Sequence, residues 1–274
     1  MVNYAFVLLP LYIYPETPTT WQPLYNAANN HPNVTFQVVV NPNSGPGAGA
    51  CPNGNDTNYI NAIATLNSIP NIKTLGYIHT ATSSTCGSSG KDICVCSQPQ
   101  SALQANISTY QNWPTAGCTA NNAKDIHVDG IFYDESPSNS TCLDYMRQIT
   151  SYAKQTLTRG STSLFNAGVQ LQENGYWDVA DYINIFENNE AALRTVNVTQ
   201  LTGDGNYASQ ATLIVYGYTS GSDQLLDDVR DILSVKNGDG VTGLSISDLN
   251  TYAAFGTNLE QFVADVDVVG QENK

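Results

Sequence analysis

The chain is 274 residues long, which suits one large domain, and it carries 24 acidic against 10 basic side chains, a formal net charge of −14. So few positive charges cannot neutralise a row of phosphates, which excludes nucleic acid as a partner. No run of about 18 apolar residues occurs, which excludes a transmembrane helix and insertion into a membrane.

Apolar, β-branched runs of strand length recur along the chain, with helical patterns between them. In chain order, the predicted strands are Ala5–Ile13, Thr35–Val40, Thr74–His79, Gly130–Asp134, Leu164–Val169, Tyr182–Glu187, Thr212–Tyr218 and Gly243–Ile246. The predicted helices are Thr20–Asn29, Thr57–Ser68, Pro99–Asn112, Cys142–Thr158, a short one at Gly175–Val179, Ala191–Asn197, Ser222–Asn237 and Leu249–Val266.

The strand runs are continuously apolar, as expected for strands that are buried on both faces. Eight of them alternating with helices predict an α/β fold, a single (β/α)8 TIM barrel over residues 1–270, with a polar tail at 271–274 and partial disorder beyond Val269. An open doubly wound sheet is the competing interpretation. It is disfavoured because Leu11–Pro15, after the first strand, lacks the glycine-rich turn of a nucleotide site. We therefore expect no cofactor.

All six cysteines lie in the first half of the chain, mostly in stretches typical of loops: Cys51, Cys86, Cys94, Cys96, Cys118 and Cys142. An even count beside five Asn-x-Ser/Thr sequons, at Asn33, Asn55, Asn106, Asn139 and Asn197, predicts a secreted glycoprotein that can associate with a cell wall. The pairing stays open, because six cysteines permit about 15 connectivities. The Cys94-x-Cys96 spacing is too short for a zinc knuckle, so we expect no metal and interpret Thr82–Gln98 as a disulfide-pinned loop.

Two predicted strands end on carboxylates. Asp129–Glu135 stops on Asp134 and Glu135, and Asp181–Glu187 stops on Glu187. Active sites of parallel α/β folds lie at the carboxyl ends of strands, so these acids can meet at one rim. Alternation along the first of these strands turns Asp134 toward the barrel axis, together with Gly130. Three acids and no spare histidine favour glycosidic bond cleavage, with Asp134 as nucleophile or base, Glu187 as acid and Glu135 beside them.

Other strand ends carry residue types that suit a sugar. Aromatic faces stack on the C–H side of pyranose rings, and amides or carboxylates match hydroxyl and acetamido groups. The predicted substrate-binding residues are Tyr12, Tyr14, Asn41, Asn43, Tyr77, His79, Asn166, Tyr216, Tyr218 and Asp248.

Non-catalytic interpretations remain open for these residues. Asp134 and Glu135 stand before Ser136-Pro137 and can cap a helix, and Glu187 can be a solvated loop acid. The tyrosines can be packed aromatics, and Asn41–Gly47 is foremost a rigid turn. The chain contains no Gly-x-Ser-x-Gly elbow, P-loop or His-Glu-x-x-His motif that would indicate another chemistry.

The chain resembles the spherulin-4-like proteins, which are grouped with the glycoside hydrolases. The matching segments are Pro10–Pro15, Trp21–Leu24, Asn41–Gly47, Leu75–Thr80, Asp129–Glu135 and Phe186–Glu187. The resemblance implies a (β/α)8 barrel and an endo-α-1,4-N-acetylgalactosaminidase directed at galactosaminogalactan, with its acidic trio on Asp134, Glu135 and Glu187. Glu190 lies three residues beyond the last of these. The Thr82–Gln98 segment is longer than the family's usual connection.

We therefore predict a secreted, metal-independent hydrolase whose only partner is its polysaccharide substrate and which acts as a monomer. The alternative from another class is a non-catalytic cell-wall or spore-coat protein that keeps the sugar groove without turnover. A third interpretation is a secreted effector that binds host glycans.

Overall fold

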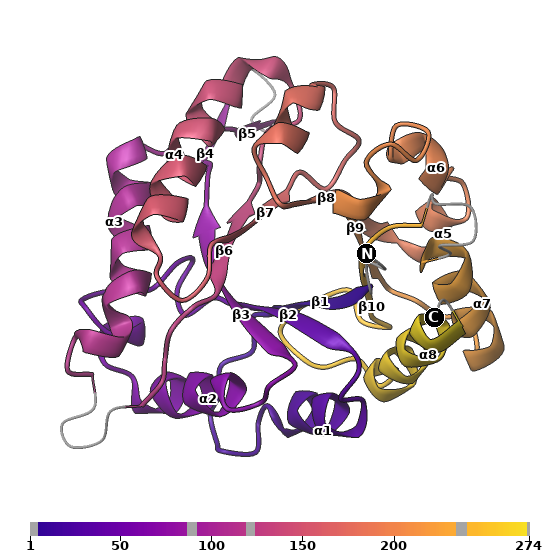
Figure 1. The fold of residues 1–274 in the computed structure, drawn as a ribbon, viewed down its shortest axis with the longest axis horizontal. Helices are drawn as coiled ribbons and strands as arrows, with labels where there is room; N and C mark the ends of the chain where they lie inside the picture. Colours follow the sequence, from indigo (N-terminus) through magenta and orange to yellow (C-terminus); the bar gives the residue numbers. More distant parts are fainter. Residues whose placement is uncertain (1–4, 87–91, 119–123, 234–239, 273–274) are drawn as a thin grey trace.

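Eight parallel strands close into a barrel, and the longer helices form a ring around it (Figure 1). The structure is a computed structural model that describes residues 5–86, 92–118, 124–233 and 240–272. Around the barrel the order is β1, β10, β9, β8, β7, β6, β3 and β2. The strands are β1 (Phe6–Leu11), β2 (Thr35–Val40), β3 (Ile72–His79), β6 (Gly130–Asp134), β7 (Thr162–Asn166), β8 (Tyr182–Asn189), β9 (Ala211–Tyr216) and β10 (Gly243–Ile246). The predicted (β/α)8 barrel and its eight strands are confirmed.

Apolar side chains cover both sides of the barrel wall. Alternate residues of a strand point to opposite faces, so each strand contributes to two layers. The inner layer fills the barrel with residues such as Leu8, Phe132 and Leu164. The outer layer, which includes Ile131 and Tyr133, lies in the larger core beneath the helices. Burial on both faces explains why the strands are continuously apolar in sequence.

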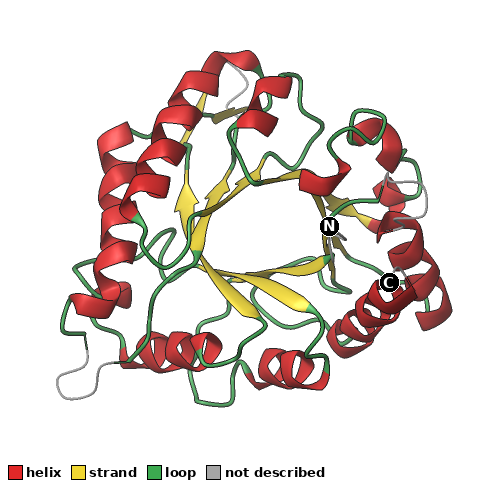
Figure 2. Cartoon of the chain, viewed as in Figure 1, coloured by secondary structure: helices red, strands yellow, loops and turns green. Residues whose placement is uncertain are grey.

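The helices surround the sheet, as Figure 2 shows by colour. They are α1 (Gln22–Asn30), α2 (Thr57–Asn67), α3 (Gln100–Asn112), α4 (Leu143–Thr156), α5 (Glu190–Leu193), α6 (Val198–Leu201), α7 (Ser222–Leu233) and α8 (Leu259–Glu272), with a 3-10 turn at Asn174–Asp178. Local signals explain several helix starts: the Asp56 carboxylate accepts the backbone N–H groups of Asn58 and Tyr59 at the start of α2. Of the helices in the described ranges, none is both long and apolar enough to cross a membrane.

The predicted helix at Leu249–Val266 is wrong in its first half. The Asp248 carboxylate accepts the backbone N–H of Thr257, and Oδ1 of Asn258 accepts the backbone N–H of Asp248, so the segment folds back on itself as a loop. The last helix, α8, begins only at Leu259 and continues to Glu272, which also corrects the disorder expected beyond Val269.

Two further helix predictions change at their ends. The predicted helix at Ala191–Asn197 is too long: α5 ends at Leu193, and Asn197 instead caps the next helix, α6, by accepting the backbone N–H of Gln200. The last residues of the predicted helix at Ser222–Asn237 lie outside the described residues.

A hairpin outside the barrel occupies the segment that was expected to be a pinned loop. It consists of β4 (Thr82–Cys86) and β5 (Asp92–Cys94), which pair antiparallel. The disulfide Cys96–Cys142 ties the end of the hairpin to the start of α4, and Cys51–Cys118 ties the loop after β2 to the segment after α3. These bonds agree with the predicted disulfide framework.

Candidate active site

The three predicted acids line one open pocket at the carboxyl end of the barrel. Asp134 ends β6, Glu135 follows it directly, and Glu187 lies near the end of β8. The pocket encloses about 650 Å³, a volume that includes part of the solvent at its open mouth, and it is completed by Val95, Ser136, Asn166, Ala167 and Gly168. Carboxyl groups from two strands thus share one hollow.

Asp134 points into the barrel because of its place on β6. It alternates with Phe132, which lies in the inner layer, while Ile131 and Tyr133 face outward. Oδ2 of Asp134 accepts a hydrogen bond from the Tyr77 hydroxyl at 2.6 Å, and Oδ1 accepts one from Nδ2 of Asn166 at 2.8 Å. Burial and the neighbouring Asp134 charge raise the pKa of Tyr77, so this phenol stays protonated and donates.

Glu187 reaches the same pocket because β8 is irregular. The pairing of β8 with β9 shifts between Asn184 and Phe186, which marks a β-bulge. Ile183, Ile185 and Phe186 all belong to the outer core. Without the bulge, regular alternation would place Glu187 on that outer side with Ile183. The extra residue turns the glutamate inward.

Two donors hold the Glu187 carboxylate. The hydroxyl of Tyr252 donates to Oε1 at 2.6 Å, and Nδ2 of Asn166 donates to Oε2 at 2.7 Å. Burial and the Glu187 charge raise the pKa of Tyr252, which keeps its hydroxyl protonated. Gly168 lies beside this glutamate with φ of +64°, and its carbonyl accepts the backbone N–H of Glu187 at 2.9 Å.

One nitrogen bridges Asp134 and Glu187 and therefore limits the separation of their carboxyl groups. Nδ2 of Asn166 lies 2.8 Å from Oδ1 of Asp134 and 2.7 Å from Oε2 of Glu187. These two oxygens are at most about 5.5 Å apart, and roughly 4.8 Å apart when the amide N–H bonds diverge by about 120°. A gap of this size is close to that between the carboxyl groups of retaining glycosidases, about 5 to 5.5 Å.

Glu135 is directed by an unusual backbone conformation. Its φ is 52°, in the left-handed region, and its side chain lines the pocket instead of following Tyr133 outward. Its carboxylate contacts Nε2 of His79, which stands at the end of the neighbouring strand β3. The Thr80 hydroxyl lies 2.9 Å from the Glu135 carbonyl oxygen and donates to it.

Four of the predicted substrate-binding residues lie around the acids. Tyr77, His79 and Asn166 contact them directly, as described above. The ring of Tyr12 makes edge-to-face contacts with Tyr77 and Tyr252, with ring centres 5.5 and 5.6 Å apart. The hydroxyls of Tyr77 and Tyr252 donate to Asp134 and Glu187, so this group of rings lies beside the acids.

Three predicted substrate-binding residues form hydrogen bonds within the loops after β1 and β2. The exposed Tyr14 donates its hydroxyl to Asp56 at 3.0 Å. Oδ1 of Asn41 accepts the backbone N–H of Gly45, and the backbone N–H of Asn43 donates to the Gly45 carbonyl, so both serve the turn. None of the contacts described for these three reaches the acidic cluster.

The remaining three lie at the end of β9, which neighbours β8, and in the loops after β9 and β10. Tyr216 donates to Oδ1 of Asn188 at 3.5 Å, and Asp248 closes the loop before α8. Tyr218 is only 3% exposed and donates its hydroxyl to Asp228 at 2.6 Å, so its ring is packed inside the protein and not presented to the pocket.

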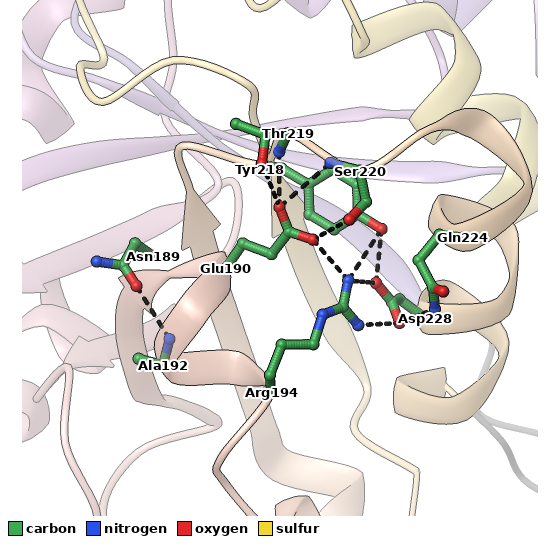
Figure 3. Close-up of polar contacts among 9 residues, drawn as sticks. All are labelled: Asn189, Glu190, Ala192, Arg194, Tyr218, Thr219, Ser220, Gln224 and Asp228. Carbon is green, nitrogen blue, oxygen red and sulfur yellow. Dashed lines mark hydrogen bonds and ion pairs between the residues drawn. The ribbon is translucent and has the colours of Figure 1, made fainter.

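Glu190, the other acid near the end of β8, forms its contacts with other protein groups away from the pocket (Figure 3). It accepts backbone N–H groups from Thr219 and Ser220 at 2.7 and 3.2 Å and pairs with Arg194 at 2.7 Å. Burial opposes ionisation, but the donors from Ser220, Thr219 and Arg194 outweigh it and lower the pKa of Glu190 to about 2. Glu187, not Glu190, is therefore the β8 acid that faces the pocket.

Sequence reasoning missed two residues of this site. Tyr252 was assigned to a helix, although the polar Gly256-Thr257-Asn258 before an apolar run is a signal for a later helix start. Asn184, fully buried inside the barrel, donates Nδ2 to Oδ1 of Asn166 at 2.7 Å. Its position on a predicted strand gave no functional signal. Within the described ranges, no cluster of three or more His, Cys, Asp or Glu side chains could hold a metal ion.

Comparisons with known proteins show the family of the chain and proteins of similar structure. The profile of the family described as spherulation-specific family 4 matches residues 6–266. No curated protein sequence matches the chain. The crystal structure of Aspergillus clavatus Sph3 in complex with GalNAc is similar, with 29% identity, a TM-score of 0.77, and coverage of 97% of this chain and 98% of that one. A chitinase from Bacteroides thetaiotaomicron, at 12% identity and a TM-score of 0.53, covering 98% and 97%, shares the fold alone.

Proposed function

The chain belongs to spherulation-specific family 4, and on this premise we propose that it is a secreted glycoside hydrolase that cuts inside an amino-sugar polysaccharide. The bond that is cleaved is the α-1,4 linkage of N-acetylgalactosamine or galactosamine residues. The polymer is of the galactosaminogalactan type. Support comes from the similar Sph3 structure, which holds GalNAc, and from the three carboxylates in one pocket. The observation that carries the proposal is the Asn166 bridge between Asp134 and Glu187.

The short separation of this pair supports a double displacement with retention of configuration. Asp134 attacks the anomeric carbon, and the bond to the leaving sugar breaks while Glu187 gives its proton to the leaving oxygen. A glycosyl ester on Asp134 results. Water then attacks the same carbon, Glu187 takes the proton from it, and the ester bond to Asp134 breaks, which restores both groups. In an α-linked sugar the 2-acetamido group is poorly placed to assist, so an enzyme carboxylate must perform the displacement.

The surrounding residues support these roles. Tyr77 and Asn166 donate to the two oxygens of Asp134, and Tyr252 and Asn166 donate to those of Glu187, so both carboxyl groups are held in fixed positions. Glu135, held by His79, adds a third acidic side chain at the edge of the pocket. The half-buried rings of Tyr12 and Tyr252 offer the aromatic surface nearest the acids to a sugar ring. The disulfides and the sequons support secretion. Action as a monomer without metal or cofactor remains part of the proposal.

Galactosaminogalactan hydrolysis by the protein and its carboxyl variants tests this function. New reducing ends should form with the unmodified protein and fall by several orders of magnitude in Asp134→Asn and Glu187→Gln, with polysaccharide binding retained. Glu190→Gln is the matched control, because it removes a carboxylate three residues from Glu187 without touching the pocket. Binding without cleavage by the unmodified protein would favour the non-catalytic wall protein.

Product stereochemistry tests the mechanism separately. Proton NMR during the first turnovers should show the α-anomer of the new reducing end, as retention requires. Azide added to Asp134→Gly should restore cleavage and give the β-glycosyl azide, whereas azide added to Glu187→Gly should give the α-azide. A first-formed β-anomer from the unmodified protein would contradict the double displacement.

A further inference from the structure

Three polar side chains form one rung inside the barrel. Asn166 of β7 is in register with Asn184 of β8, and Asn184 is in register with Thr212 of β9. Asn184 and Thr212 are fully buried, and Asn166 is 8% exposed. Buried polar groups lower the stability of a protein unless each forms a hydrogen bond. Here the partners are one another and the acids above them.

The hydrogen bonds of this rung run in one direction. The Thr212 hydroxyl donates to Oδ1 of Asn184 at 3.5 Å, and Nδ2 of Asn184 donates to Oδ1 of Asn166 at 2.7 Å. Nδ2 of Asn166 then donates to both Asp134 and Glu187. An amide has one donor end and one acceptor end, so the orientation of Asn184 decides which end Asn166 presents to the acids.

We propose that Asn184, oriented by Thr212, is a positioning residue of the site: it holds the Asn166 amide so that its N–H groups bridge the two carboxyls. The inference rests on the proposed function for its catalytic consequence. If Asn166 turned over, its carbonyl oxygen would face two carboxyl groups and its NH2 group would face that of Asn184. Both arrangements repel, so the rung and the acids admit one orientation.

Asn184→Asp tests the direction of the bond. An ionised carboxylate at this position cannot donate to Oδ1 of Asn166, whereas a protonated carboxyl group can, and burial raises the pKa of such a group. At neutral pH we expect kcat to fall by about 100-fold, comparable to losing a preorganised donor, with KM within about twofold. Activity should return in part as the pH falls. Asn184→Leu lacks any donor, so it should stay low at every pH.

The surrounding titratable groups do not obscure this readout. The side chains around the rung are the carboxyls of Asp134 and Glu187, beyond Asn166, and the phenols of Tyr12, Tyr77, Tyr182 and Tyr252. Burial raises the pKa of all four phenols, so they remain neutral over the acid range. The unmodified protein carries the same two carboxyls, so its own pH profile serves as the baseline.

Asn71→Asp is the matched control. Nδ2 of Asn71 donates to the carbonyls of Ala28, His31 and Val34 before β3, at the other end of the barrel, so the same substitution there removes donors without affecting the pocket. Its kcat and pH profile should match those of the unmodified protein under conditions where it is folded. Thr212→Val removes only one hydroxyl, so it tests the same chain of hydrogen bonds if the Asn184 variants fail to fold. Its kcat should fall several-fold.

The side-chain amide resonance of Asn166, followed by 15N NMR without substrate, separates this inference from the proposed function. We expect its shift to change in Thr212→Val, and in Asn184→Asp at neutral pH, and to return toward the original value in Asn184→Asp on acidification. An unchanged Asn166 resonance in both variants would overturn the inference whether or not the protein hydrolyses sugar. Equal loss of kcat in Asn184→Asp and Asn184→Leu at all pH values would also overturn it. If the resonance responds while the unmodified protein cleaves nothing, the positioning stands and the proposed hydrolase fails.

Discussion

Glu135 shows how single residues depart from regular geometry at this site. A side chain with a Cβ is strained at φ of 52°, and such strain persists only where the surroundings impose it. The Thr80 hydroxyl supplies part of that constraint, since it contacts the carbonyl oxygens of both Asp134 and Glu135, at 2.8 and 2.9 Å. The result is that two adjacent acids face the same pocket, although successive strand residues normally face opposite sides.

Glu190 gives a stability prediction. Its pKa falls from the usual 4.5 to about 2, because donors from Ser220, Thr219 and Arg194 outweigh burial. A lowered pKa stabilises the fold above the unfolded value and loses that effect as the pH falls through the folded value, here between about 4.5 and 2. Glu190→Gln should therefore lower the free energy of unfolding at pH 7 by about 3 kcal/mol. The gap between the two proteins should narrow as the pH falls toward 2.

Urea unfolding at pH 7, 5 and 3 measures this gap. The exposed Asp178 offers a control, because Asp178→Asn removes an acid of similar charge outside the Glu190 cluster. A difference between Glu190→Gln and the unmodified protein that stays constant over this pH range would contradict the linkage. A difference below about 0.5 kcal/mol at pH 7 would show that the cluster adds no more than an exposed ion pair does.

At the scale of elements, the sequence predicts the barrel but not the turning of every side chain. Continuous apolar runs predict all eight strands, and alternation along β6 predicts that Asp134 faces inward. The bulge that turns Glu187 inward depends on how β8 pairs with β9, which no local pattern reveals. The loop that carries Tyr252 is closed by Asp248 and Asn258 across ten residues, and its sequence shows only where the next helix starts, not where the tyrosine points.

The β4–β5 hairpin gives an element-scale prediction, because it brings Val95 to the wall of the acid pocket. Val95 is 39% exposed there, and the disulfide Cys96–Cys142 and the hydrogen bond from Tyr145 to the Gln98 carbonyl anchor the hairpin's exit. An apolar side chain at this wall suits the methyl of an acetamido group. Replacing both Cys96 and Cys142 by Ser should raise KM for acetylated polymer several-fold and leave kcat nearly unchanged.

Steady-state kinetics on acetylated galactosaminogalactan measures the predicted effect of the hairpin on KM. The other disulfide serves as the control. Removing Cys51–Cys118, which links residues 67 apart in the sequence, should lower the free energy of unfolding by about 4 kcal/mol on the chain-entropy estimate without changing KM. Val95→Ser with both disulfides intact should reproduce the higher KM. If the two disulfide variants share the same KM, the hairpin has no part in recognising the substrate.

At the scale of the whole molecule, the acids at the two ends of the barrel differ in whether they form ion pairs. Acids at the end where the strands begin are paired: Asp129 with His127 and Lys73, and Asp267 with His31. In the described part of the chain, no Lys or Arg forms an ion pair with the three pocket acids, and His79 is the one basic side chain that contacts any of them. The overall charge of −14 thus adds to an acidic cluster that is largely left unneutralised.

This charge predicts a dependence on salt that differs between two forms of one substrate. A partly deacetylated galactosamine polymer is cationic and is attracted to the acidic protein, whereas the fully acetylated polymer is neutral. Raising the salt from about 0.01 M to about 1 M shortens the screening length from roughly 30 Å to roughly 3 Å. KM for the deacetylated polymer should therefore rise several-fold, and KM for the same polymer after chemical re-acetylation should change little.

Initial rates with both polymers at each salt concentration provide the measurement, and kcat is expected to vary little because the Asp134–Glu187 pair is bridged at short range. A parallel rise of KM for both polymers would indicate a general effect of salt on the polysaccharide and would remove electrostatic attraction from the account of substrate binding.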